Sequence, residues 1–79
     1  MDWDNVRVFL AVARAGQFVA AAKRLRLDHA TVSRRIASLE TGFGARLFDR
    51  LTTGAKLTAA GETFLSTAEQ METAFLHAQ

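Results

Sequence analysis

The sequence predicts a mainly α-helical domain with one short β-hairpin, and three observations support this prediction. Proline is absent from the 79 residues, and the chain is rich in alanine and leucine, which favour helices. Over most of the chain, apolar residues recur at spacings of three and four, as they do on one face of a helix. Segment 45–57 interrupts that spacing and contains a glycine suited to a turn. A chain of this length forms one small domain.

The first predicted helix covers about residues 4–15. Its apolar residues recur at helical spacing and are Val6, Phe9, Leu10 and Ala13. Gly16 follows at a position where glycine often takes the left-handed conformation that ends a helix. We therefore expect this helix to bury one face and to end before Gly16.

Two further helices are predicted over 18–25 and 29–41, separated by the three residues 26–28. The shorter helix carries alanines that allow close approach of another helix, and its apolar face consists of Phe18, Ala21, Ala22 and Leu25. Asp28 can cap the longer helix, because its carboxylate can accept from free N–H groups of the first turn. The longer helix turns Val32, Ile36 and Leu39 inward. Two helices joined by a short turn in this way form a helix-turn-helix, here over about 18–37.

The segment that follows has the features of a two-stranded hairpin, which would form a wing over about 46–57. Leu47 and Phe48 are apolar and suit a strand. Residues 51–54 form the predicted turn, in which Gly54 is the one residue typical of turns. The predicted fold is therefore a winged helix-turn-helix, with three helices and a two-stranded wing in residues 1–58.

A final long helix is predicted over 59–78, with Thr58 as its cap. Its apolar residues alternate at spacings of three and four and are Gly61, Phe64, Ala68, Met71 and Phe75. A helix of about 20 residues spans roughly 30 Å, which is long for a small domain to cover. The helix either lies across the core or pairs with a second copy. We favour a dimerisation and linker helix over 59–79, with an interface formed by Phe64, Ala68, Met71 and Phe75.

The chain stops at Gln79 without the glycine, proline or basic residue that usually ends a helix. We therefore expect this last helix to continue as a linker in a longer protein.

Charge is distributed unevenly along the chain. The net charge is only +2, yet all ten Lys and Arg residues lie between Arg7 and Lys56. The part after Lys56 carries only acidic charge, from Glu62, Glu69 and Glu72. A basic body beside an acidic helix indicates that one end of the molecule meets phosphates.

Several classes of function are not expected. No cysteine is present, so disulfides and thiolate metal sites are absent. Charged residues interrupt the first fifteen positions, so no signal peptide is expected, and no run of 18 apolar residues predicts a membrane span. His29 and His77 are far apart in the sequence, and no phosphate-binding loop, metal-ligand spacing or catalytic carboxylate pair occurs. We therefore expect that the protein is not an enzyme and that it binds neither a metal ion nor a cofactor.

The outer face of helix 29–41 is the candidate surface for reading DNA, since an α-helix fits the major groove. Arg34 is best placed to read a base, because its guanidinium can bond guanine O6 and N7 together. Ala30 can touch a thymine methyl, while His29 and Thr31 can contact bases or phosphate. Further predicted contacts, mainly to phosphates or to the minor groove from the wing, are Ser33, Arg35, Ser38, Arg50, Thr52, Thr53 and Lys56.

The residues together resemble the N-terminal domain of LysR-type transcriptional regulators. The resemblance covers essentially the whole chain without gaps and rests on Phe9-Leu-Ala-Val-Ala13, Gly16, Phe18-Val-Ala-Ala-Ala-Lys-Arg-Leu25, Leu27-Asp-His-Ala-Thr-Val-Ser-Arg-Arg-Ile36, Leu39-Glu40, Gly44-Ala-Arg-Leu-Phe48, Arg50 and Leu57-Thr-Ala-Ala-Gly61. It implies a bacterial cytoplasmic regulator, associated with the nucleoid, that binds double-stranded promoter DNA. It also implies a homodimer paired through the last helix, a tetramer of the full-length protein, and a small-molecule effector bound by a C-terminal domain absent from this chain.

The resemblance adds Gln17 and Phe18, at the start of helix 18–25, to the expected DNA contacts. The family usually carries serine at the position of Gln17, and glutamine is a poorer cap for that helix. Positions 28–30 commonly read Ser-Gln-Pro in the family, whereas here they are Asp28, His29 and Ala30. These departures bear on which operator sequence is recognised.

Two other functions fit parts of the pattern. A winged helix can serve as a protein–protein interaction module, in which case the basic residues are only solvated. The N-terminal DNA-binding domain of a molybdate-responsive regulator shares much of the same pattern. A steep fall of DNA affinity with salt would separate DNA binding from the first alternative.

Overall fold

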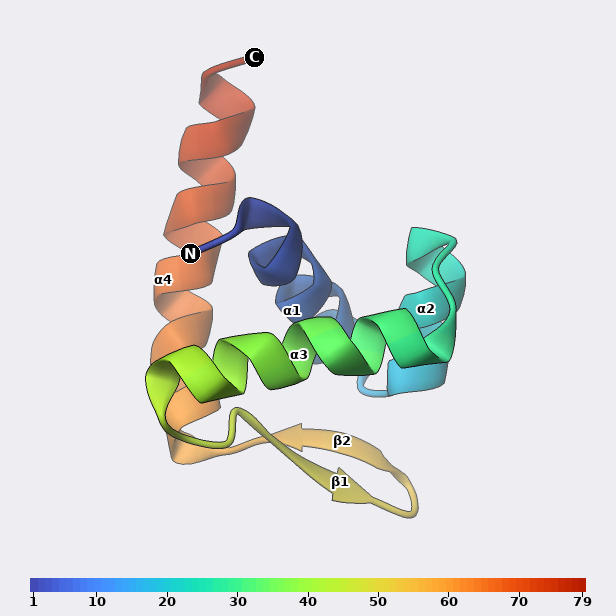
Figure 1. Ribbon diagram of the computed structural model, residues 1–79. Helices are drawn as coiled ribbons and strands as arrows, with labels where there is room; N and C mark the ends of the chain where they lie inside the picture. Colours follow the sequence, from blue (N-terminus) through green and yellow to red (C-terminus); the bar gives the residue numbers. More distant parts are fainter.

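The computed structural model describes residues 1–79 as four helices and one antiparallel hairpin (Figure 1). In Figure 1, α3 crosses the front of the molecule, the hairpin lies below it, α1 lies behind it, and α4 rises to the C-terminus. Every predicted element is present, so the winged helix-turn-helix architecture is confirmed. The elements are α1 (Trp3–Ala15), α2 (Phe18–Leu25), α3 (His29–Phe43), β1 (Phe48–Leu51), β2 (Gly54–Leu57) and α4 (Ala59–His77).

Side chains cap three of the helices at their first turns. Asp28 accepts a hydrogen bond from the Thr31 N–H at 2.7 Å, and Thr58 accepts one from the Gly61 N–H at 3.0 Å. Asp2 caps α1 in the same way. Helix α3 runs two residues beyond the predicted end, because Gly42 remains helical and Gly44 supplies the left-handed residue, with φ 67°, that ends it.

The hairpin is joined by a two-residue turn and docks on the connection between α1 and α2. Phe48 pairs with Leu57, and Leu51 with Gly54. The Ala55 N–H donates to the Gly16 carbonyl at 2.8 Å. A Cβ at Gly54 would collide with that same carbonyl, so glycine is required for this close approach. The wing is therefore tied to the helix-turn-helix through the backbone.

A continuous apolar core joins all the helices to the hairpin. Phe9 of α1 lies at its centre, with its ring centroid 4.8 Å from that of Phe64 and 5.2 Å from that of Phe48. Gly61 brings α4 so close to the Leu47 carbonyl that any Cβ there would clash. Small and aromatic residues thus fix where α4 crosses the domain.

Helix α4 packs part of its apolar face into the core of its own domain, which corrects the predicted dimer seam at Phe64 and Ala68. Phe64 is 5% exposed and Ala68 is fully buried, so neither side chain can meet a partner helix. Met71 is partly buried, and the Phe75 ring stacks on Trp3 with centroids 4.8 Å apart. The N-terminal part of the predicted spacing therefore marks the contact of α4 with its own domain, whereas Phe75 remains 42% exposed.

An ion pair between Arg14 and Glu72 also joins α4 to α1. Two Arg14 guanidinium nitrogens donate to the two Glu72 carboxylate oxygens, at 2.7 and 2.9 Å. This arrangement lowers the pKa of Glu72 below its usual value, mainly through the hydrogen bonds from Arg14.

Candidate nucleic-acid interface

The outer face of α3 carries the predicted reading residues in one exposed row. His29, Ala30, Arg34 and Ser38 are exposed, and Thr31 is half-exposed. One Arg34 guanidinium nitrogen donates to the Thr31 hydroxyl at 3.1 Å. This contact directs Arg34 toward the N-terminal half of α3 and leaves most of its donors free.

The N-terminus of α3 is stabilised by Asp28. Hydrogen bonds from Thr31 hold the pKa of the Asp28 carboxyl below its usual value, with a smaller contribution from the charge of Arg34. The carboxylate thereby accepts a hydrogen bond from one of the backbone N–H groups that have no partner within the helix. The departure of residue 28 from the serine usual in the family therefore preserves the cap.

Arg35 is turned toward α1. Its Nη1 donates to the Asn5 Oδ1 at 3.0 Å, and the Asn5 amide reaches the Ser38 hydroxyl at 3.5 Å. Asn5 was not among the predicted contacts, because Asn5 and Arg35 lie 30 positions apart and no helical spacing relates them. Arg35 therefore flanks the reading row in a fixed position.

Arg50 of the wing lies over α2 and α3. Its Cζ is 3.8 Å from the centroid of the Phe18 ring, and its Nη2 donates to the Ser33 hydroxyl at 3.0 Å. Phe18 is only 7% exposed, so its side chain offers little surface for the predicted contact with DNA. Phe18 instead supports Arg50 through a cation–π contact. Three predicted DNA contacts thus form one cluster that joins the wing to the recognition helix.

Polar residues surround a groove of about 300 Å³ between the wing tip and the starts of α2 and α3. Gln17 makes no side-chain hydrogen bond to cap α2. Thr53 and Lys56 are also exposed on the hairpin. The residues lining the groove are Gln17, Phe18, Val19, His29, Arg50, Leu51, Thr52 and Gly54.

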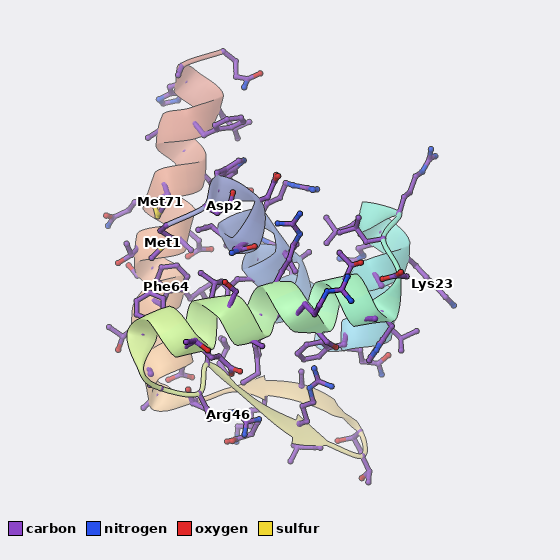
Figure 2. All side chains as sticks on the ribbon, viewed as in Figure 1. Met1, Asp2, Lys23, Arg46, Phe64 and Met71 are labelled. Atoms are coloured by element: carbon purple, nitrogen blue, oxygen red, sulfur yellow. The ribbon has the colours of Figure 1, made fainter.

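Three exposed cations that were not among the predicted contacts lie at the end of α2. Lys23, Arg24 and Arg26 make no ion pair, since the three ion pairs of the molecule involve other residues. Figure 2 shows Lys23 extending away from α2. Arg26 has a φ of 56°, the only left-handed conformation at a residue other than glycine. Their proximity to one another was evident in the sequence, but their freedom from acidic partners was not.

The molecule offers no grouping of three or more His, Cys, Asp or Glu side chains that could hold a metal ion. None of its helices is long and apolar enough to cross a membrane.

Comparison with known proteins identifies the family. Residues 3–62 match the family model described as bacterial regulatory helix-turn-helix protein, lysR family. The chain belongs to the LysR family. This match decides between the two families of regulator considered from the sequence. Among curated LysR relatives, the transcriptional regulators TfdT of Cupriavidus pinatubonensis and ClcR of Pseudomonas putida are each 42% identical over 71 residues, which is 90% of this chain.

The chain spans 31% of the length of TfdT and 24% of that of ClcR. Solved LysR structures have the same fold. A crystal structure of the CbnR DNA-binding domain with DNA matches 99% of this chain and 90% of its own chain, with a TM-score of 0.94 and 36% identity. A complex of the BenM DNA-binding domain with catB site 1 DNA has a TM-score of 0.94 and 28% identity, and the match covers 99% and 88% of the two chains.

Proposed function

We propose that this LysR-family chain binds double-stranded promoter DNA sequence-specifically and regulates transcription, with α3 in the major groove. The observation that carries the proposal is the capped helix α3, which presents Arg34 at the centre of an exposed polar row. The likeness to the CbnR and BenM domains, which were solved with DNA, supports it. This is a binding function, and it assigns no catalytic step to any residue.

The proposed contacts divide into reading and positioning residues. Arg34, Ala30 and His29 meet base edges, together with Thr31. The remaining residues position the duplex through its phosphates or the minor groove, and they are Gln17, Ser33, Arg35, Ser38, Arg50, Thr52, Thr53 and Lys56. Arg50 and Ser33 bond each other in the free protein, so they meet DNA as one unit.

We also infer the assembly and setting of the full-length regulator. A homodimer forms through the part of α4 that its own domain leaves open, with Met71, Phe75 and Leu76, and two dimers associate as a tetramer. Phe75 is 42% exposed and Leu76 is 60% exposed, which supports this assignment. A small-molecule effector binds a separate domain outside these residues, and the regulator acts in the bacterial cytoplasm.

The salt dependence of DNA affinity tests the proposal. The chain is titrated onto promoter fragments and onto a duplex of unrelated sequence at several salt concentrations. We expect tighter binding to one promoter fragment and a steep fall of affinity with salt, because each neutralised phosphate contributes about −0.9 to the slope of log K against log salt. A flat slope, or no binding to any fragment, would favour a protein–protein interaction module.

A further inference from the structure

A small polar pocket lies where the start of α1 meets the flank of α3. It has a volume of about 300 Å³, and no apolar residue lines it. Its lining side chains come from two helices and are Asp2, Asn5, Thr31, Arg34, Arg35 and Ser38. The pocket therefore adjoins the reading row but is built partly from α1, to which the proposed function assigns no contact.

The arginines of this pocket are oriented without being neutralised. Arg35 donates to the side-chain Oδ1 of Asn5 at 3.0 Å, and Arg34 donates to the Thr31 hydroxyl at 3.1 Å. Neither guanidinium forms an ion pair. Each guanidinium has five N–H donors, so most donors of Arg35 stay free for a phosphate, and most donors of Arg34 stay free for the base edge that it is proposed to read. Neutral oxygen atoms thus orient both guanidinium groups, and no paired carboxylate offsets their positive charge.

The donor set suits a phosphate. Guanidinium groups bond phosphate oxygens through two parallel N–H groups, and hydroxyl and amide groups add further donors. We propose that this pocket seats one backbone phosphate of the bound DNA, and that Asn5 positions Arg35 to hold it. This inference rests on the proposed DNA binding and adds helix α1 to the interface.

Asp2 is the one acidic side chain in the pocket, and it gives the proposal a sharp test. Its Oδ1 accepts the Asp4 N–H at 2.9 Å and so caps α1. The carboxylate repels a phosphate seated beside it, whereas asparagine would cap α1 equally well without the charge. Removing this charge is therefore expected to strengthen DNA binding.

Two aspartates at the start of α1 allow a comparison at equal net charge, although Asp2 caps the helix and Asp4 pairs with Arg7. Asp2→Asn and Asp4→Asn change the net charge equally, but Asp4 lies outside the pocket and pairs with Arg7 at 3.7 Å. Binding to a duplex of arbitrary sequence is measured for both variants, because phosphate contacts do not depend on sequence. We expect Asp2→Asn to bind several-fold more tightly than Asp4→Asn. Equal affinities of the two variants would overturn the proposal.

Asn5→Asp tests the role of the α1 amide. The new carboxylate would pair with Arg35 and occupy the donors meant for the phosphate. We expect the fold to be retained and the magnitude of the salt slope to fall by about 0.9, the value for one lost phosphate contact. Arg35→Ala should reduce the slope by the same amount, and the two changes together should reduce it no further.

The outcomes separate this inference from the function on which it rests. If the native chain binds the duplex and Asn5→Asp binds with the same affinity and slope, the phosphate site is wrong while DNA binding stands. If the native chain binds no duplex, both fail. Thermal unfolding verifies that each variant is folded, and should Asn5→Asp not fold, the two aspartate variants decide the question.

Discussion

Arg34 and Arg35 are adjacent in sequence but take different partners. Arg34 bonds a hydroxyl of its own helix, while Arg35 bonds a side chain of α1. One guanidinium therefore lies along the reading row and the other at its edge. Neighbouring residues of the same type thus have different proposed roles, reading and positioning, because the helix turns by roughly 100° per residue.

Replacing Arg34 by alanine should cost specific DNA binding about 1–3 kcal/mol and relax the preference at one base position. The physical reason is the loss of a bidentate contact to a base edge. Competition among promoter fragments with single base changes measures the effect. Arg24→Ala, which removes an exposed cation outside the reading row, serves as the control. Equal losses on specific and unrelated DNA would show that Arg34 contacts only phosphate.

At the scale of elements, α4 depends on one close approach. Gly61 has no space for a Cβ, because the Leu47 carbonyl of the segment before β1 occupies it. Gly42 is also helical, but its Cβ direction is open. The packing therefore excludes a side chain at Gly61, whereas a side chain at Gly42 would meet no neighbouring atom.

Substituting each glycine by alanine tests this difference. Gly61→Ala should lower the free energy of unfolding by about 1–3 kcal/mol, because the backbone of the packed segment must move. Gly42→Ala should raise it by about 0.5–1 kcal/mol, because alanine restricts the unfolded chain and favours the helix. Denaturant unfolding gives both values. Similar changes at the two positions would show that the contact at Gly61 does not limit packing.

The contact between α1 and α4 also predicts a pH dependence. Arg14 lowers the pKa of Glu72, so its ionised carboxylate stabilises the folded state above the usual glutamate pKa. That contribution is lost as the pH falls through the lowered value. Thermal unfolding midpoints of the native chain should therefore fall more steeply on acidification than those of Glu72→Gln. Parallel curves would mean that the pair adds no stability.

The sequence was sufficient for the helices, the wing and two of the caps, Asp28 and Thr58, because these depend on local spacing and on local residue type; the cap of α1 by Asp2 was not predicted. The sequence was insufficient where one spacing of apolar residues is compatible with two kinds of packing, as in α4. The apolar positions of α4 suit a partner helix and a core equally well, and only the burial of Phe64 and Ala68 assigns those two positions to the core. The contacts of Asn5 and Arg50 join distant segments, so no local pattern predicts them.

Over the whole molecule, basic residues and the acidic helix lie in separate parts. Lys and Arg are confined to residues 7–56, whereas α4 carries Glu62, Glu69 and Glu72. Glu72 is paired with Arg14. None of these three glutamates is among the proposed DNA contacts. The exposed end of α4, with Phe75 and Leu76, is the apolar surface available to a second copy.

Leu76→Glu should weaken self-association, because the charge would have to be buried between two copies. Leu76 is 60% exposed, so the fold of the single chain should be unaffected. Sedimentation over a range of concentrations measures the change. Lys23→Gln shifts the net charge equally on a distant helix and should leave association unchanged. An intact dimer of Leu76→Glu would place the interface elsewhere.

The hydrogen bond from Ala55 to the Gly16 carbonyl has a consequence for how such domains diversify. It fixes the strands of the wing to the connection between two helices, so the direction of the hairpin does not depend on its tip. Thr52 and Thr53 are exposed and lie outside both strands. The tip can therefore accept substitutions while the strands stay in place, which would change the proposed contacts of the wing with phosphates or the minor groove without changing the fold.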